Sequence, residues 1–362
     1  MKVGIFHMGN ISLAARTFFR ELKVEVVVPP PNNQATLTLG TRYSPETACI
    51  PYKLILGNFI QDLEMGADTL VMVTSTNVAC RMGYYARSMT WTLEDLGYKF
   101  EMIVPGDRER GLVSMLKFIK GRANNVPWLK LIASFRFGLA KLSTLDELER
   151  LVHRMRPVET TKGTVNRLWQ EAQETIDQAG TPASLKAVEK EFTQKLTSVP
   201  RDPQAQPLLV GLVGETFVLM DPFSSRDLES ELGKLGVEVM RRNFASQWLR
   251  LGSVSSGWKE QAHRAAQPYL KRSVGGEGWE SVGEKVLYSR SCDGVVHLSP
   301  FTCMPEIVAQ NIMTSTREDI PVLTVLCDEQ TGKQGLITRL EAFVDLLRHR
   351  RQRKEYAGIP GY

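Results

Sequence analysis

The sequence predicts an α/β protein with two doubly wound parallel-sheet (Rossmann-like) domains and an intervening helical segment. At both ends of the chain, short apolar runs alternate with amphipathic helical patterns, which is typical of βαβ units. Between residues 109 and 198, apolar positions recur with a period of 3.6 and no strand pattern is present. A chain of 362 residues is also longer than one core usually holds.

We therefore expect four parts. They are an N-terminal Rossmann-like domain over 1–108, a helical insertion and linker over 109–205, a C-terminal Rossmann-like domain over 206–350, and a tail over 351–362.

The first domain is expected to open with a βαβ unit and to continue with two more strands. A loop should lead from the second strand to Cys49, and Pro51 suits the first turn of the helix that follows. The apolar runs predict strands over 2–6, 24–28, 67–74 and 100–104, and the helical patterns predict helices over 11–22, 51–65 and 84–96.

The rest of the chain is expected to contain a purely helical part and then a second α/β unit. The Pro-rich segment 199–207 reads as a linker. The second unit should contain strands over 208–215, 294–299 and 321–326, and helices over 305–314 and 336–350.

Composition excludes several classes of partner. The net charge is +5, but the basic residues are spread among nearly as many acids, apart from the run at 348–354, which a solvated helix end explains. We therefore expect no nucleic-acid partner. No apolar run approaches the roughly 20 residues of a membrane helix, and the N-terminus lacks a signal-peptide pattern, so we expect a cytoplasmic protein without a membrane partner.

A phosphate-binding loop is also excluded. Gly332-Lys333 lies between a strand and a helix, but Gln334 stands where the ATP-binding pattern needs Ser or Thr, and the upstream glycine is missing. We therefore do not expect this chain to hydrolyse ATP.

Three of the five cysteines share one setting. Cys49, Cys80 and Cys303 each stand between an apparent strand end and a helix. Each could simply be a small buried hydrophobe. However, open α/β sheets bind ligands outside the carboxyl ends of their strands, so the three thiols could converge on one metal or redox site.

Three thiolates are fewer than the four that an iron–sulfur site usually has. One iron of a [4Fe-4S] cluster held by them would therefore keep an open coordination position. Cys327 follows the next strand and is the candidate for a fourth ligand, whereas Cys292 is expected to be structural. Glu215 and Glu306 are weak candidates for catalytic acids or bases, because solvated carboxylates and helix caps are commoner at strand ends.

A family resemblance lies in six runs of residues. The runs are GIFHMGN, PETACIPYKLILGNFIQDLEMGAD, ACRMGYY, VGE, PFTCMPE and DEQTGKQGLITRLEAFVDLL. Through them the chain resembles the 2-hydroxyacyl-CoA dehydratase family over roughly 1–105 and 205–347, and most closely its short CoA-protein activase-like branch, which is related to dehydratase subunits and double-cubane cluster proteins.

The resemblance implies two facing Rossmann-like domains with a [4Fe-4S] cluster between them, held by Cys49, Cys80 and Cys303. Two features depart from the family pattern: Lys333 and Gln334 replace an expected acidic and a small residue, and no further cysteines could hold a second cubane.

The function expected from this resemblance is that of the cluster-binding component of a dehydratase-like or reductase-like system. Its partners would be an ATP-hydrolysing activator of the actin and sugar-kinase superfamily, which supplies a low-potential electron, a related dehydratase-like subunit, and an acyl-CoA substrate. The alternative is a non-enzymatic iron–sulfur electron-transfer or partner subunit without its own acyl-CoA site. Thioester binding with a reductant-dependent spectral change would favour the enzyme.

Overall fold

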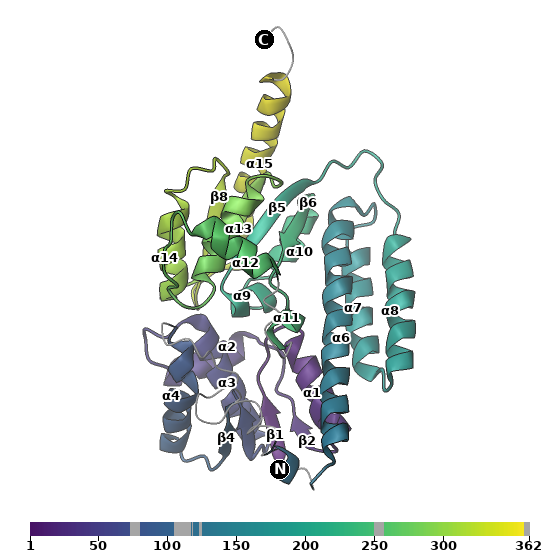
Figure 1. The fold of residues 1–362 in the computed structure, drawn as a ribbon, viewed down its shortest axis with the longest axis vertical. Helices are drawn as coiled ribbons and strands as arrows, with labels where there is room; N and C mark the ends of the chain where they lie inside the picture. The colour runs from purple at the N-terminus through teal and green to yellow at the C-terminus, as the bar shows by residue number, and fades with distance from the viewer. Residues whose placement is uncertain (73–79, 105–116, 118, 123–124, 250–256, 358–362) are drawn as a thin grey trace.

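Two four-stranded parallel sheets form the centres of two α/β units (Figure 1). The computed structural model describes residues 1–72, 80–104, 117, 119–122, 125–249 and 257–357. The strand orders are β2-β1-β3-β4 and β6-β5-β7-β8, so both sheets have the same topology and all their strand pairs are parallel. The predicted fold class is confirmed.

The first unit follows the predicted order of strands and helices, with one helix added. Its strands are β1 (Lys2–Ile5), β2 (Glu25–Val27), β3 (Thr69–Val71) and β4 (Glu101–Ile103), and its helices are α1 (Ile11–Glu21), α2 (Gln34–Tyr43), α3 (Ile50–Glu64) and α4 (Met82–Asp95). Positions 73 and 74 of the third predicted strand lie outside the described residues.

Helix α2 occupies the segment that we expected to be a loop. The Asn33 side chain caps it by accepting hydrogen bonds from the backbone N–H groups of residues 35 and 36. A Cβ atom at Gly40 would lie 1.7 Å from the carbonyl oxygen of Lys53, so the glycine lets α2 pack directly on α3. Cys49 therefore follows a helix, and our expectation that it follows a strand was wrong.

The second unit has a β5-β7 centre covered on both faces. All seven residues of β7 are buried, as expected for a central parallel strand. The strands are β5 (Leu208–Gly214), β6 (Val237–Arg241), β7 (Gly294–Pro300) and β8 (Val322–Cys327). The helices are α9 (Thr216–Met220), α10 (Leu228–Lys234), α11 (Ala245–Leu249), α12 (Gly257–Ala266), α13 (Gly278–Tyr288), α14 (Met304–Met313) and α15 (Lys333–Ala357).

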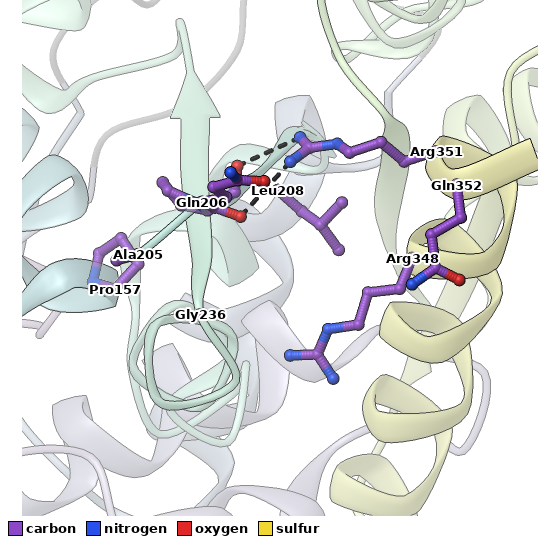
Figure 2. A pocket seen from close by; sticks show the side chains of 9 residues that line it. Pro157, Ala205, Gln206, Leu208, Gly236, Arg348, Arg351 and Gln352 are labelled. Atoms are coloured by element: carbon purple, nitrogen blue, oxygen red, sulfur yellow. Dashed lines mark hydrogen bonds between the residues drawn. The ribbon is translucent and has the colours of Figure 1, made fainter. Parts of the chain in front are cut away.

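Helix α15 is longer than predicted and projects away from the body of the protein (Figure 1). It continues past Arg350 to Ala357, so much of the expected tail is helical. Arg351 donates hydrogen bonds to the carbonyl oxygens of Gln206 and Pro207, beside a cavity of about 350 Å³ (Figure 2). Its Nη2 also lies 2.5 Å from Asp293 Oδ2. Arg348 donates to the carbonyl oxygen of Leu235. These arginines fasten α15 to the body, so a purely solvated helix end does not describe them.

The helical part lies beside both units (Figure 1). It consists of α6 (Trp128–Met155), the short turn η1 (Arg156–Val158), α7 (Thr164–Gln178) and α8 (Pro182–Thr197). These helices share a separate apolar core, and α6 also contacts α1 and β6. The predicted helical character is confirmed for the described residues; residues 105–116, 118 and 123–124 lie outside them.

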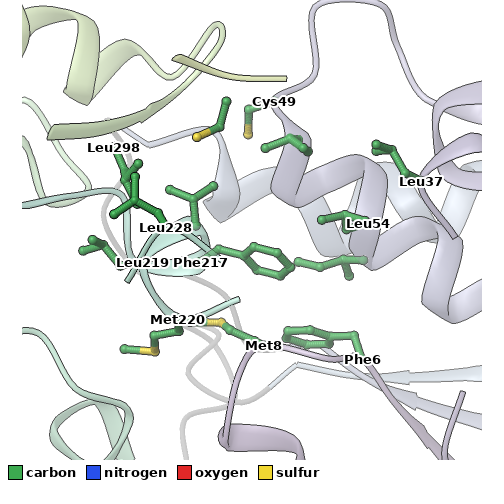
Figure 3. Packing of buried hydrophobic residues seen from close by; sticks show 14 of the residues in the cluster. Phe6, Met8, Leu37, Cys49, Leu54, Phe217, Leu219, Met220, Leu228 and Leu298 are labelled. Carbon is green, nitrogen blue, oxygen red and sulfur yellow. The ribbon is translucent and has the colours of Figure 1, made fainter. Parts of the chain in front are cut away.

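The two α/β units share one continuous apolar core. Phe6 and Met8 of the first unit pack close to Phe217 and Met220 of the second (Figure 3). Gly9 has a φ of +50°, and a Cβ atom there would lie 2.3 Å from the carbonyl oxygen of Met220. The turn after β1 is therefore shaped to fit against α9. Across the described parts of the chain, no helix is both long and apolar enough to cross a membrane.

Candidate functional site

The three predicted cysteines lie at helix starts. Cys49 precedes α3 and is buried, Cys303 precedes α14 and is buried, and Cys80 lies two residues before α4 and is half-buried. A helix that links two parallel strands starts near the carboxyl edge of the sheet. The thiols are thus placed where ligands bind in open α/β sheets.

The backbone at the carboxyl edge of the second sheet requires glycine at one position. Gly214, at the end of β5, has a φ of +140°, and a Cβ atom there would lie 2.0 Å from the carbonyl oxygen of Leu298. No other residue fits without displacing β7. The next residue, Glu215, caps α9 by accepting hydrogen bonds from the N–H groups of Phe217 and Val218, at 3.0 and 3.1 Å.

Hydrogen bonds join the loops that carry the three cysteines. Arg81 donates from Nη1 to the carbonyl oxygen of Thr47, at 3.0 Å, and from Nη2 to the carbonyl oxygen of Thr302. The Thr302 hydroxyl donates to the same Thr47 carbonyl, at 2.9 Å, across 255 positions of sequence. We call these three residues the loop junction. It brings together residues within two positions of Cys49, Cys80 and Cys303.

Among the described residues, the three cysteines do not form a group whose ligand atoms all lie within 4.8 Å of one another. Among the described residues, the group whose ligand atoms all lie within 4.8 Å of one another is Glu149, His153 and Glu229, far from the cysteines in sequence. A four-iron cluster is larger than one ion, so its thiolate ligands stand further apart, at about 6–7 Å.

The surroundings of the thiols disfavour their ionisation when no metal is bound. Burial raises the pKa of Cys49 to about 11, and burial with the nearby charge of Glu306 raises the pKa of Cys303. Burial also raises the pKa of Cys80. The positive charge of Arg81 acts in the opposite direction on Cys49 and Cys80. Tyr85 places its hydroxyl in hydrogen-bond contact with the Cys49 sulfur.

The two carboxylate candidates have different environments. Burial raises the pKa of Glu215 to about 7, and its charge acts on all three thiols. Glu306 is fully buried; its Oε2 lies 2.8 Å from His297 Nε2 and accepts a hydrogen bond from Ser281, at 2.9 Å. The pKa of Glu215 thus lies near neutral pH, whereas Glu306 is part of a buried hydrogen-bonded network.

The other two cysteines, Cys327 and Cys292, differ from each other in burial and in position. Cys327 ends β8 opposite Pro300, and its carbonyl oxygen accepts a hydrogen bond from the N–H of Phe301, so it adjoins the Cys303 loop. Its side chain is buried. Cys292 lies before the opposite end of β7, half-buried beside Ser291.

Two further polar contacts cross between the units. Lys53, one turn after Cys49, is almost fully buried, and its Nζ lies 2.8 Å from Glu329 Oε1. Asn32 donates to Asp221, at 2.9 Å. Sequence reasoning missed Lys53, Thr302 and the contacts of the loop junction. The sequence signal of Lys53 and Thr302 was only that they lie inside the cysteine-centred runs.

The Glu149, His153 and Glu229 group was also not predicted. It lines a cavity of about 250 Å³ between the helical part and the second unit. The buried Arg241 guanidinium already contacts both carboxylates, with Nη2 2.9 Å from Glu149 and Nε 3.3 Å from Glu229. A guanidinium therefore balances the charge that a metal ion would otherwise balance.

Lys333 pairs with two carboxylates at the surface. Its Nζ lies 2.8 Å from Asp227 and 3.3 Å from Glu231. The lysine is thus committed to two carboxylates, and it lines a cavity of about 380 Å³ together with Gln34, Arg226 and Glu329.

Comparison with known protein families gives a match in the first unit. Residues 3–78 match a family model described as a CoA enzyme activase uncharacterised domain. This match supports the resemblance to the CoA-protein activase-like branch of the 2-hydroxyacyl-CoA dehydratase family over a short region that contains Cys49 but neither Cys80 nor Cys303. The search of curated proteins returned no match.

Proposed function

We propose that Cys49, Cys80 and Cys303 hold one [4Fe-4S] cluster in the cluster-binding component of a 2-hydroxyacyl-CoA dehydratase-like or reductase-like system. The loop junction is the observation that carries this proposal, because it gathers three cysteine loops from two sheets. Thiolates are the ligands that iron–sulfur clusters prefer. When bound by three thiolates, such a cluster supplies one-electron transfer and one iron with an open coordination position.

The residues around the thiols suit such a site. Burial of Cys49 and Cys303 keeps water from the sulfur atoms, and the fixed positive charge of Arg81 stabilises thiolate ligands nearby. Glu215, with its pKa raised to about 7 by burial, can take or release a proton near neutral pH. Its carboxylate is held in place by the N–H groups at the start of α9.

The proposed system includes a separate ATP-hydrolysing activator of the actin and sugar-kinase superfamily and a related dehydratase-like subunit. The description of the matching domain supports a partnership of this kind. Lys333 is paired with Asp227 and Glu231, and the ATP-binding pattern around it is incomplete, so we assign ATP hydrolysis to the separate activator.

The alternative is an iron–sulfur electron-transfer or partner subunit without an acyl-CoA site of its own. The cavity of about 380 Å³ beside Glu329 supports this alternative, because none of the three cysteines lines it. A thioester bound there would not touch the proposed ligands.

The proposal is tested by anaerobic reconstitution of the full chain with iron and sulfide. We expect about four iron atoms per chain and a cluster absorption spectrum. Replacing Cys49, Cys80 or Cys303 by Ala should abolish bound iron, whereas Cys292→Ala, the matched control, should retain it. A wild-type chain that takes up no iron would refute the cluster. Titration with acyl-CoA thioesters then separates the two functions: a spectral change on binding supports the enzyme, and reduction without any response supports the subunit.

A further inference from the structure

Arg81 forms a direct link between the two α/β units. Its Nη1 donates to Thr47, in the loop before Cys49, and its Nη2 donates to Thr302, in the loop before Cys303. Arg81 follows Cys80 directly. One guanidinium on the Cys80 loop therefore contacts both the Cys49 loop and the Cys303 loop. A planar guanidinium has two outward N–H edges, which lets one side chain fix two acceptors at a defined separation.

Thr302 has an unusual backbone conformation. Its φ is +68°, and the N–H of Cys303 donates to the carbonyl oxygen of Pro300, at 2.9 Å. In such a turn this third position is normally taken by Gly or Asn, and a β-branched residue there is strained. Strained conformations persist only where the surrounding contacts enforce them. The conformation directs the Thr302 hydroxyl and carbonyl to the other unit, where they meet Thr47 and Arg81.

The loop junction is a polar link between the Cys303 loop and the first unit. Inside its own unit, this loop is held by the N–H of Phe301, which donates to Cys327, and by the turn from Pro300. These contacts set the conformation of the loop but not its distance from Cys49 and Cys80. That distance is set across the unit boundary.

We propose that Arg81 is a positioning residue whose guanidinium, with Thr302, holds the Cys303 loop at a fixed distance from the Cys49 and Cys80 loops. The consequence for metal binding rests on the cluster site proposed above. The link between the loops does not, because it is argued from the hydrogen bonds of Arg81 and Thr302 alone.

The test compares two pairs of variants with a control. Arg81→Met removes all the donors while keeping an extended side chain, and Arg81→Lys keeps the charge but not the fork. Thr302→Val removes the hydroxyl while keeping the shape of the side chain, and Thr302→Ser keeps the hydroxyl. Arg87→Met removes a positive charge from α4, the helix that follows Arg81, at an exposed residue that contacts the ring of Trp91.

The first readout is hydrogen exchange in the iron-free chain. We expect at least fivefold faster exchange in peptides covering 46–50 and 300–304 for Arg81→Met and Thr302→Val, a smaller increase for Arg81→Lys, and rates of the wild type for Thr302→Ser and Arg87→Met. The overall melting temperature, measured on the same samples, identifies any variant that is globally unfolded. If a variant at one of the two positions, 81 or 302, is unfolded, the pair of variants at the other position tests the proposal.

The second readout is the rate of iron release to a chelator from the reconstituted chain, with the electron paramagnetic resonance spectrum of the reduced form. Release should be at least tenfold faster in Arg81→Met than in Arg87→Met, with a changed spectrum. Exchange rates in Arg81→Met equal to those of Arg87→Met would overturn the positioning role, whatever the iron content. A wild-type chain without iron would instead refute the cluster, and the exchange readout would still decide the role of Arg81.

Discussion

His297 and Glu306 form a completely buried hydrogen-bonded pair, with Nε2 2.8 Å from Oε2 and both side chains at 0% exposure. His297 lies on the central strand β7, and Glu306 lies in the first turn of α14, three residues after Cys303. Ser281 donates to the same carboxylate oxygen, and Thr324 lies 3.3 Å from His297 Nδ1. The pair therefore fixes the start of α14, and with it Cys303, against the sheet.

Removing this histidine should destabilise the second unit. His297→Leu leaves the Glu306 carboxyl buried without its main partner, so we expect the free energy of unfolding to fall by about 3 kcal/mol. The measurement is urea denaturation of the iron-free chain. His263→Leu is the control, because His263 also lies 2.9 Å from a glutamate, Glu280, but its side chain is 36% exposed. There the loss should be about 1 kcal/mol or less, and equal losses would contradict the argument.

Asp62 should make the protein less stable as the pH rises. Its carboxyl is fully buried beside Gly4 of β1, neither oxygen has a hydrogen-bond partner, and burial raises its pKa to about 9. Since its ordinary pKa is 3.8, the folded state must hold a proton that the unfolded state releases above about pH 4. This costs about 1.4 kcal/mol per pH unit up to about pH 9.

Asp62→Asn should therefore stabilise the protein, by up to about 4 kcal/mol at pH 7, and the gain should grow with pH. Denaturation curves from pH 5 to pH 9 measure it. Asp68→Asn is the control of opposite sign. Slight burial acts to raise the pKa of Asp68, but hydrogen bonds from Lys2 and Thr69 and the N-terminal charge outweigh it and lower the pKa. Its replacement should cost stability at neutral pH and less in acid. A gain for Asp62→Asn that is independent of pH would show that the carboxyl is not protonated.

Glu229 should make the packing of the helical part sensitive to acid. Burial alone would raise its pKa, but Arg241, His153 and Arg156 outweigh burial and lower the pKa to about 2. Because the folded pKa lies below the ordinary value of 4.5, the stabilisation is complete above about pH 5 and is lost as the pH falls toward 2. The loss should be on the order of 3 kcal/mol.

Glu229→Gln should remove that part of the acid dependence and lower stability at pH 7. Fluorescence-monitored unfolding between pH 2 and pH 7 compares it with Glu171→Gln, which breaks an exposed pair with Arg167 on α7. The control should change stability by less than about 1 kcal/mol at any pH. If both variants keep the same acid profile as the wild type, Glu229 is not the group that titrates.

Much of the fold follows from local patterns, whereas the site depends on how the units meet. The strands are short apolar runs, and period and length identify them. Helix α2 has the small and polar sequence QATLTLGTRY, and it is stabilised by close packing of Gly40 and Gly57 against facing backbone, which periodicity does not reveal. The cysteines could be selected from their positions before helices. Arg81 and Thr302 could not, because their contacts exist only once the two sheets are placed against each other.

Cys327 is the thiol that decides whether a cluster in this site would have an open position. Its thiol donates toward the carbonyl oxygen of Val325, 3.9 Å away on the same strand, and burial raises its pKa to about 12. It is also part of the apolar core at the end of β8. These contacts favour a packing role over a fourth ligand.

Cys327→Ala should therefore keep about four iron atoms per chain after anaerobic reconstitution, while lowering the free energy of unfolding by about 1–2 kcal/mol because it leaves a small cavity. Iron analysis and urea denaturation of the same preparation measure both effects. Cys303→Ala, on the neighbouring loop, is the matched comparison and should lose its iron. Loss of iron from Cys327→Ala to the same extent would make Cys327 the fourth ligand and close the coordination position that substrate binding requires.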